Sequence, residues 1–277
     1  MNLEKPIVLL LIIQAVTGMY YELTEFHIPY WIQNGNVPEI FEVAHFVRRI
    51  FRYLSIVLTI VGAIKIIQNQ EIKLNKAFKL PMYYLVGSSI TWIIASTLST
   101  KFSYINFSDQ MNWYTYLLIF LNQVLLLLIV LHFVLKNDNE FIVSYVEVGK
   151  WSRFWNWTID RIIIFSFSFS YLQLLGEGSI IEDIEILNNN PYWYLALNMF
   201  LYYFVLEALF KQTIGKLHSG AIVISEDNRT KTAFIRTICR FIPLEAFSFF
   251  GKKGLHDSIS NSLVGKASEN EFVFDEI

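Results

Sequence analysis

Residues 151–176 read WSRFWNWTIDRIIIFSFSFSYLQLLG, an aromatic cluster followed by charges and then by a long apolar run. On a helix, Arg153 and Asp160 are almost two turns apart, so they project from nearly the same side, about 10 Å apart along the axis. Asp160 and Arg161 lie at the start of an apolar segment that is long enough to cross a membrane. Burying an ionisable side chain there is unfavourable unless it contacts a partner or water. We therefore interpret this stretch as a membrane helix that begins beside a charge pair.

The composition of the chain indicates a membrane protein. Of its 277 residues, 54% are hydrophobic and only 17% are charged, whereas a soluble domain carries about 25% charged residues. The net charge of −2 excludes a broadly basic protein that binds nucleic acid. The single cysteine, Cys239, excludes an internal disulfide and any zinc site built on several cysteines. We expect an all-α polytopic membrane protein whose main partner is the lipid bilayer.

Apolar stretches that suit membrane-spanning helices recur six times along the chain. They cover residues 6–20, 53–67, 80–98, 113–135, 158–176 and 191–210. The first has features of both a signal peptide and an uncleaved helix, and we favour the helix because no cleavage pattern follows it. An amphipathic segment at residues 38–52 leads into the second stretch. Asn122 and Gln123, inside the fourth, are expected to hydrogen-bond between helices, with a transport pathway as the alternative.

The loops between these stretches alternate in charge, which predicts how the helices are oriented. Residues 22–47 and 177–190 contain acidic residues but no lysine or arginine, so we expect them on the non-cytoplasmic side. Four lysines between residues 65 and 79 mark a cytoplasmic loop. Six spans with both termini in the cytoplasm satisfy this rule except at the arginines before the second span, whose long side chains can reach the headgroups.

After the sixth stretch, the sequence no longer has long apolar runs. Its pattern predicts a small cytoplasmic tail of strand and helix. Residues 219–225 have the pattern of a strand that ends in a turn. Residues 232–241 have helical spacing, which places Arg236 and Arg240 on one face. Residues 241–250 are apolar but too short to cross a bilayer, so we expect an interfacial or re-entrant segment there. The last residues are polar and are expected to be mobile.

Three short motifs follow one another in the second half of the chain. The first is Arg153 with Ile159-Asp160; the second is Glu207 with Thr213, Gly215 and Lys216; the third is Arg236, Arg240, Phe241-Ile242-Pro243 and His256-Asp257. In this order, and with these apolar flanks, the motifs resemble the RDD family, a group of bacterial membrane proteins named for an arginine and two aspartates. The chain departs from the family pattern at Lys211, Leu255 and Ser262, where Gly, Trp and Thr are common.

The resemblance implies residence in the bacterial inner membrane and a role in transport, with cation/proton exchange proposed for some members. It covers residues 151–264, which we expect to form an RDD-like membrane domain with two spanning helices and a cytoplasmic or interfacial segment. Residues 1–136 would form an N-terminal membrane region of four helices, to which the resemblance does not extend. Residues 265–277 would form a polar C-terminal tail.

The ionisable residues of the motifs form the candidate ion or proton site. They are Arg153, Asp160, Glu207, Lys216, Arg236, Arg240, His256 and Asp257. A short loop joins the fifth and sixth spans, so these are expected to be antiparallel neighbours, with Asp160 and Glu207 at similar depth. Because a low dielectric favours the neutral form of a carboxyl group, these two could exchange protons. The alternative is a structural cluster at the cytoplasmic interface, which we favour for Arg153.

The other polar residues predict neither catalysis nor a cofactor. His256 and Asp257 have the composition of a metal or acid/base pair, but a cap or a surface hydrogen bond is the more common role. The remaining four histidines lack metal-binding spacing. The chain also lacks a nucleophile elbow and a P-loop. We therefore expect no metal site, no cofactor and no enzymatic activity.

Two functions of different kinds fit this sequence. The first is transport of a small cation or polar solute coupled to protons, which the ionisable cluster and the family resemblance favour. Against it, the cluster is predicted near one interface, whereas transporter sites usually lie near the midplane. The second is a non-catalytic membrane scaffold that binds an unknown protein partner, or a second copy of itself, through its tail or its helices.

Overall fold

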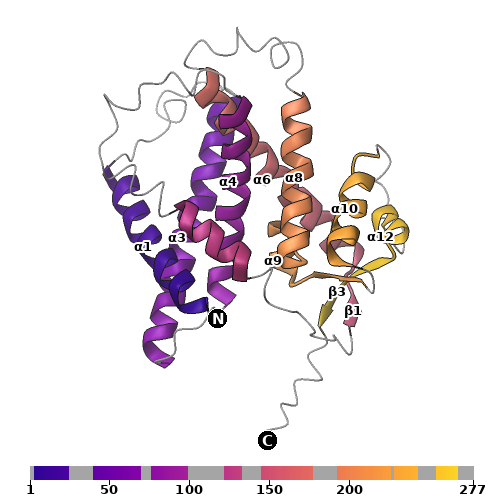
Figure 1. Cartoon of the computed structure of the whole chain (residues 1–277), viewed down its shortest axis with the longest axis horizontal. Coiled ribbons are helices and arrows are strands. Elements are labelled where there is room, and N and C mark those ends of the chain that lie inside the picture. The colour runs from indigo at the N-terminus through magenta and orange to yellow at the C-terminus, as the bar shows by residue number, and fades with distance from the viewer. Residues whose placement is uncertain are drawn as a thin grey trace, which may run out of the picture. The chain divides into compact units, whose positions relative to one another are not determined.

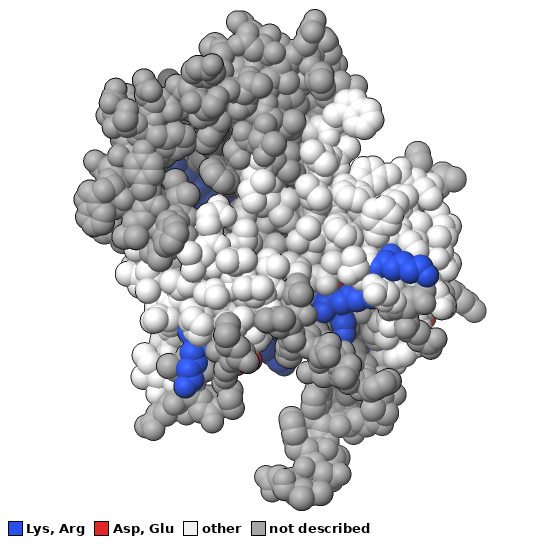
Figure 2. Space-filling view, viewed as in Figure 1, with Lys and Arg blue, Asp and Glu red and all other residues white. Residues whose placement is uncertain are grey.

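The computed structural model describes residues 3–24, 40–69, 76–98, 122–132, 145–176, 192–225, 228–242 and 254–267. These parts are mostly helical, as the sequence predicts, and they include one small β-sheet (Figure 1). On the face drawn in Figure 2, the described surface carries few charged side chains. Such a surface suits contact with lipid, because a charged side chain is costly in the bilayer core.

The chain forms two compact units. The first comprises Met1–Leu135 and Ile162–Met199, and the second comprises Lys136–Arg161 and Phe200–Ile277. Two long helices, α6 and α8, contribute residues to both units. The candidate site lies in the second unit.

The first unit is helical throughout its described residues, and its α-helices overlap the predicted spans. They are α1 (Glu4–Thr24), α3 (Ile40–Asn69), the short 3₁₀ helix η1 (Lys76–Phe78), α4 (Lys79–Leu98) and a helix over Asn122–His132. Helix α3 packs against both α1 and α4. The amphipathic lead-in and the second predicted stretch form one continuous helix, because no proline or turn signal interrupts them.

Two contacts explain how the first unit holds its helices together. Gln14 Nε2 donates a hydrogen bond to Asn122 Oδ1 over 2.7 Å, which confirms the expected hydrogen bond between helices for Asn122. Gly62 faces the ring of Phe78, and a Cβ at residue 62 would lie only 2.8 Å from that ring. The absence of a side chain at this glycine therefore lets the Phe78 ring bury itself against α3.

Two described helices are long and apolar enough to cross a membrane. They are Glu42–Gln68 within α3 and the whole of α8 (Tyr192–Phe210). A helix of 19 residues extends about 29 Å, close to the roughly 30 Å of a hydrocarbon core. The Asn122–His132 helix is apolar but shorter, and the rest of the predicted fourth span lies outside the described residues. The count of six spans remains a prediction.

The second unit joins the ends of the two long helices to a small α/β arrangement. Besides parts of α6 (Lys150–Gly176) and α8, its described elements are β1 (Tyr145–Glu147), α9 (Ile214–Ser219), β2 (Ile222–Ser225), α10 (Arg229–Cys239), α12 (Leu255–Ile259) and β3 (Ser262–Ala267). The sheet has the order β1-β3-β2, and β3 pairs antiparallel with both neighbours. A small core of Val148, Ala221 and Val264 lies beside it.

The tail differs from its prediction in where the strands lie. The strand predicted from residue 219 begins only at Ile222, because α9 continues to Ser219 and Gly220 then ends it with φ 65°. That left-handed conformation favours glycine. Strands β1 and β3 were not predicted, and β3 continues three residues beyond residue 264.

The helix predicted over residues 232–241 is confirmed as α10, which begins three residues earlier. Asn228 caps it, since its side chain accepts hydrogen bonds from the backbone N–H groups of Thr230 and Lys231, at 3.0 and 3.3 Å. Most of the apolar segment predicted at residues 241–250 lies outside the described residues. Helix α6 also begins early, at Lys150, so Arg153 and Asp160 lie on one helix, as expected.

Candidate functional site

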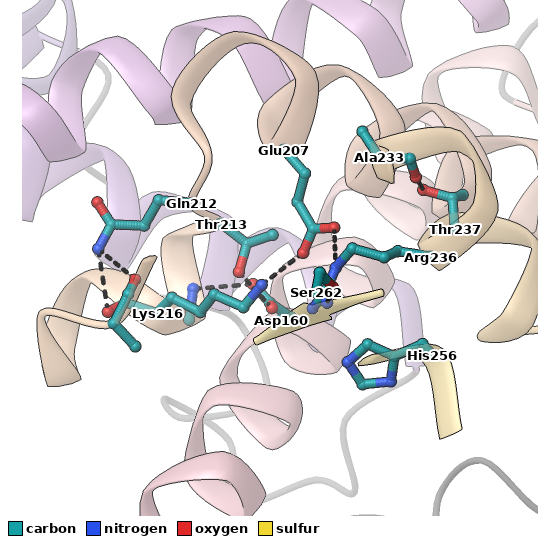
Figure 3. Close-up of polar contacts among 12 residues, drawn as sticks. Asp160, Glu207, Gln212, Thr213, Lys216, Ala233, Arg236, Thr237, His256 and Ser262 are labelled. Atoms are coloured by element: carbon teal, nitrogen blue, oxygen red, sulfur yellow. Dashed lines mark hydrogen bonds and ion pairs between the residues drawn. The ribbon is translucent and has the colours of Figure 1, made fainter. Parts of the chain in front are cut away.

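Glu207 is the centre of a buried set of ion pairs in the second unit. It lies one turn before the end of α8, and its side chain is 1% exposed. Lys216 Nζ, from α9, donates to its Oε1 over 2.5 Å, and Arg240 Nη2, just after α10, donates to the same oxygen over 2.6 Å. Arg236 Nε donates to its Oε2 over 3.1 Å. Figure 3 shows Lys216 and Arg236 reaching this carboxylate from opposite sides.

Arg236 extends these ion pairs to the elements that follow α10. Its side chain is fully buried, and its Nη1 donates both to Asp257 Oδ1 on α12 and to Ser262 Oγ on β3, the latter over 2.5 Å. His256 Nε2 lies 3.3 Å from Asp257 Oδ1. One arginine therefore connects the end of α8 to both the last helix and the central strand.

Asp160 accepts hydrogen bonds from the start of α9. Its Oδ1 accepts from Tyr202 Oη over 2.7 Å and from the main-chain N–H of Gly215 over 2.8 Å. Its Oδ2 accepts from Thr213 Oγ1 over 2.7 Å. Thr213 is the N-cap residue of α9 but makes no side-chain cap of its own. The Asp160 carboxylate therefore caps this short helix from α6, where a negative charge also suits the helix dipole.

Gly215 is the residue that allows α9 to approach α6. A Cβ at this position would lie 2.1 Å from the backbone oxygen of Asn156 and 2.8 Å from Asp160 Cγ. No side chain fits at such distances. The glycine in the second motif is therefore explained by the close contact that the Asp160 hydrogen bond requires.

Arg240 lies between a carboxylate and an aromatic ring. Its guanidinium carbon is 4.0 Å from the centre of the Tyr203 ring, close enough for a cation–π interaction. Burial alone would lower the pKa of Arg240, but the Glu207 carboxylate outweighs burial and raises it, so the side chain stays charged. The ring and the carboxylate together stabilise a buried cation at the end of α10.

The buried charges balance. We call the following six residues the charge cluster: Asp160, Glu207, Lys216, Arg236, Arg240 and Asp257. Three are carboxylates and three are cations, and all six residues are buried. Breaking one buried pair leaves an uncompensated charge, at a cost of about 3–5 kcal/mol. The five members that form ion pairs therefore depend on one another, whereas Asp160 depends on its hydrogen bonds.

Two further members of the charge cluster, Lys216 and Asp257, have shifted pKa values for identifiable reasons. Burial lowers the pKa of the Lys216 amine from 10.5 to about 8, although Glu207 opposes this change. Burial would raise the pKa of the Asp257 carboxyl, but the Arg236 guanidinium outweighs it, and the pKa falls below its ordinary value. The pKa of the Lys216 amine is therefore closer to physiological pH than that of an ordinary lysine.

The structure brings together most of the predicted site residues, but not all of them form ion pairs. Glu207, Lys216, Arg236, Arg240 and Asp257 form one connected set of ion pairs. Lys216 follows Gly215 in α9, so this short helix links that set to Asp160.

Arg153 has a contact of its own. Its Nε donates to the backbone oxygen of Val148 over 2.8 Å and so supports the start of α6. This contact agrees with the structural role that the sequence favours for it. His256 lies at the edge of the cluster, beside Asp257.

Three contributors were not predicted from the sequence as members of the site. Tyr202 binds Asp160, Tyr203 packs on Arg240, and Ser262 binds Arg236. The two tyrosines lie in an apolar helix rich in aromatic residues, where nothing distinguishes them from ring packing. Ser262 was noted only as a departure from the family pattern, and its hydroxyl retains the hydrogen-bonding group of the usual Thr.

The arrangement suits ion pairing better than metal binding. Within the described residues, no group of three or more His, Cys, Asp or Glu side chains could hold a metal ion. A cation that approached Glu207 would also meet three protein cations within 3.1 Å of its oxygens. Glu207 also lines a small pocket of about 40 Å³, together with Lys211, Ser225, Arg229 and Thr232.

Comparison with known proteins finds one family whose model matches this segment. Residues 148–261 match the model of the RDD family, which confirms the resemblance noted in the motifs. The match includes the whole charge cluster and covers a segment of the chain. No curated protein and no solved structure matches the chain. The family match and the apolar helices together point to an integral membrane protein.

Proposed function

We propose that this protein is a non-catalytic scaffold of the bacterial inner membrane, with six spanning helices and both termini in the cytoplasm. In this proposal, the charge cluster fixes a small cytoplasmic α/β region to the ends of α6 and α8. That region then presents a defined surface to a protein partner or to a second copy of the chain.

The observation that carries this proposal is the pairing of the buried charges. Glu207 has a cation on both of its oxygens, and Asp257 and Asp160 are each satisfied by groups from other elements. Buried ion pairs of this kind fix one arrangement of the chain, because removing either partner leaves an unpaired charge in a low dielectric. A transport site for a cation would instead need an acceptor that is open to the passing ion.

A second candidate function is transport of a polar solute or small cation coupled to protons. One observation favours it: Lys216 is a buried amine with a pKa of about 8, in contact with Glu207. A buried group that titrates near neutral pH is a candidate proton carrier. In this alternative, loss of the proton from Lys216 would weaken the ion pairs and let the cluster rearrange.

Proton flux and stability, measured on the same variants, separate the two functions. The protein would be placed in proteoliposomes with a pH-sensitive dye inside, with and without Na⁺ or K⁺ gradients. The variants are Glu207→Gln, which unbalances the cluster, and Glu207→Gln with Lys216→Met, which leaves two carboxylates with two cations. Lys266→Met, which removes an exposed lysine, serves as the matched control in the Glu207→Gln background.

The scaffold proposal expects flux no greater than in empty liposomes and a loss of about 3–5 kcal/mol of unfolding free energy in Glu207→Gln. Lys216→Met should restore part of that loss, and Lys266→Met should restore none. Flux in the wild type that Glu207→Gln abolishes would favour transport. Unchanged stability in Glu207→Gln would contradict the scaffold proposal.

A further inference from the structure

Helix α10 has an outer face that is apolar although it is exposed. Its inner face carries the cluster arginine Arg236 and small buried residues. On the outer face, Phe234 is 46% exposed and Ile238, one turn later, is 48% exposed. Phe241 and Ile242 continue this exposed apolar surface past the end of the helix. Contiguous exposed apolar residues usually mark a surface that contacts a partner or a membrane.

This face continues the surface of α8, the candidate membrane helix. The ring of Phe234 lies 6.0 Å from that of Phe200 and 6.1 Å from that of Phe204, both edge to face. The Phe241 ring lies 6.4 Å from the same Phe200. All four residues belong to the second unit. Whatever surrounds this side of α8 therefore also contacts the outer face of α10.

The position along α8 indicates how deep α10 lies. Phe204 and Phe200 precede Phe210, the end of the helix, by about 9 and 15 Å at 1.5 Å per residue. An amphipathic helix in the membrane interface buries its apolar face about 5–10 Å into the boundary between headgroups and acyl chains. A ring that contacts both phenylalanines is therefore at the depth of lipid acyl chains when α8 spans the membrane.

The charges of α10 are arranged to suit that position. Arg236 and Arg240 point to the inner side, where Glu207 and Asp257 neutralise them. The helix begins with Arg229 and Lys231, and basic residues at a cytoplasmic interface are attracted to anionic headgroups. The charge cluster thus neutralises Arg236 and Arg240, so that these two arginines do not prevent α10 from entering an apolar environment.

We infer that α10 is an interfacial membrane helix, lying in the leaflet at the C-terminal end of α8 with Phe234, Ile238, Phe241 and Ile242 against lipid. This inference rests on α8 crossing the membrane, as the proposed architecture requires. It assigns a lipid contact to α10 itself, which the sequence alone predicts to be part of a cytoplasmic tail, and it joins this helix to the interfacial segment predicted at residues 241–250.

Spin labelling in lipid vesicles tests this assignment. Cys239, which is buried, would be replaced by Ser, and single cysteines would be introduced for nitroxide labels. The test positions are Phe234→Cys and Ile238→Cys, the second in case loss of the phenylalanine disturbs folding. Leu197→Cys on the exposed side of α8 is the lipid control, and Thr230→Cys at the exposed start of α10 is the water control.

The vesicles would contain phosphatidylcholine and phosphatidylglycerol, and each label would be relaxed by oxygen or by a water-soluble nickel complex. Labels at residues 234 and 238 should resemble that at residue 197, with access to oxygen severalfold greater than access to nickel. The label at residue 230 should show the reverse. This result would support the lipid contact, because oxygen concentrates in the acyl region.

Each other outcome overturns the inference in a recognisable way. Nickel access at residues 234 and 238, with residue 197 still in lipid, would place α10 in water and leave the membrane architecture intact. Immobile labels that neither reagent reaches would mean that protein covers this face. Nickel access at residue 197 as well would show that α8 does not cross the membrane, and the proposed architecture would fail with the inference.

Discussion

The main-chain N–H of Gly215 donates to Asp160 Oδ1 over 2.8 Å, so the start of α9 lies directly against the middle of α6. These two residues come from different motifs, and their contact gives a reason for the presence of each. The aspartate needs a donor in a buried environment, and only a glycine lets the backbone come near enough to supply one. The contact therefore fixes the geometry from which Lys216 reaches Glu207.

Replacing Gly215 by Ala should severely destabilise the protein. The new Cβ would lie 2.1 Å from Asn156 O, so α9 must move away from α6 and the Asp160 hydrogen bond must break. We expect a loss of about 3 kcal/mol or more in unfolding free energy, measured by thermal unfolding in detergent. Gly149→Ala is the matched control, because its Cβ would meet nothing within 4 Å. Similar stability in the two variants would mean that this close contact does not form.

The structural and proton-linked roles of Asp160 predict different results for Asp160→Asn. The carboxylate accepts three hydrogen bonds, and an amide can accept at only one of its two atoms. A structural Asp160 should therefore lose about 2–3 kcal/mol of stability in this variant. Tyr202→Phe, which removes one of the donors, should lose about 1 kcal/mol. An Asp160→Asn variant of full stability without the wild-type proton flux would instead favour the proton-linked role.

Lys211 has a left-handed backbone conformation, which is energetically unfavourable for lysine. Its φ is 55°, in the left-handed region, at the position where the family commonly has Gly. The Lys211→Gly variant should be more stable than Lys211→Ala by about 1 kcal/mol, because both lack the lysine side chain and differ mainly in the cost of this conformation. Thermal unfolding of the two variants measures that difference. Equal stability would indicate that residue 211 is free to leave the left-handed region.

The pKa of Lys216 predicts how stability changes in mildly alkaline solution. The folded-state pKa is about 8 and the ordinary value is 10.5, so between these pH values the unfolded chain holds more protons. Unfolding free energy then rises with pH in this window, and the contribution of Lys216 is constant below it. The wild type should therefore gain stability relative to Lys216→Met as pH increases from 8 to 10. A constant difference between the two would mean that the amine has its ordinary pKa.

The sequence predicts the helices well because the signal is local. The length of the apolar run and the residues at its two ends predict the bounds of α4 and α8 to within about one residue. The predicted membrane span in α6 starts only at residue 158, because the first two turns of this helix are aromatic and charged instead of uniformly apolar. A span predicted from hydropathy marks the apolar part of a helix and not its ends.

The sheet and part of the site could not be predicted in the same way. Strands β1 and β3 pair residues that are more than 100 positions apart, such as Tyr145 with Ala267, and are too short for a clear alternating pattern. The sequence places Glu207 and Lys216 in the second motif and Arg236 in the third, but it does not predict the ion pairs between them. Their contacts depend on where α9 and α10 fold back, which no local pattern encodes.

The stability of the protein should depend on a hydroxyl at residue 262, and less on whether Ser or Thr supplies it. Arg236 Nη1 donates to Ser262 Oγ over 2.5 Å, and within the described residues Nη2 of the same guanidinium has no hydrogen-bond partner. Ser262→Ala removes an acceptor from a buried, charged donor, which should cost about 1–3 kcal/mol in thermal unfolding.

The Ser262→Thr variant keeps the oxygen and adds a β-branched side chain in strand β3, so it should remain near wild-type stability. Ser258→Ala, at an exposed position on α12, is the control for loss of a hydroxyl that faces solvent. If Ser262→Ala and Ser258→Ala are equally stable, the Arg236–Ser262 hydrogen bond contributes nothing, and Arg236 is held by its carboxylates alone. If Ser262→Thr is as unstable as Ser262→Ala, the space around β3 restricts this position more than the hydrogen bond does.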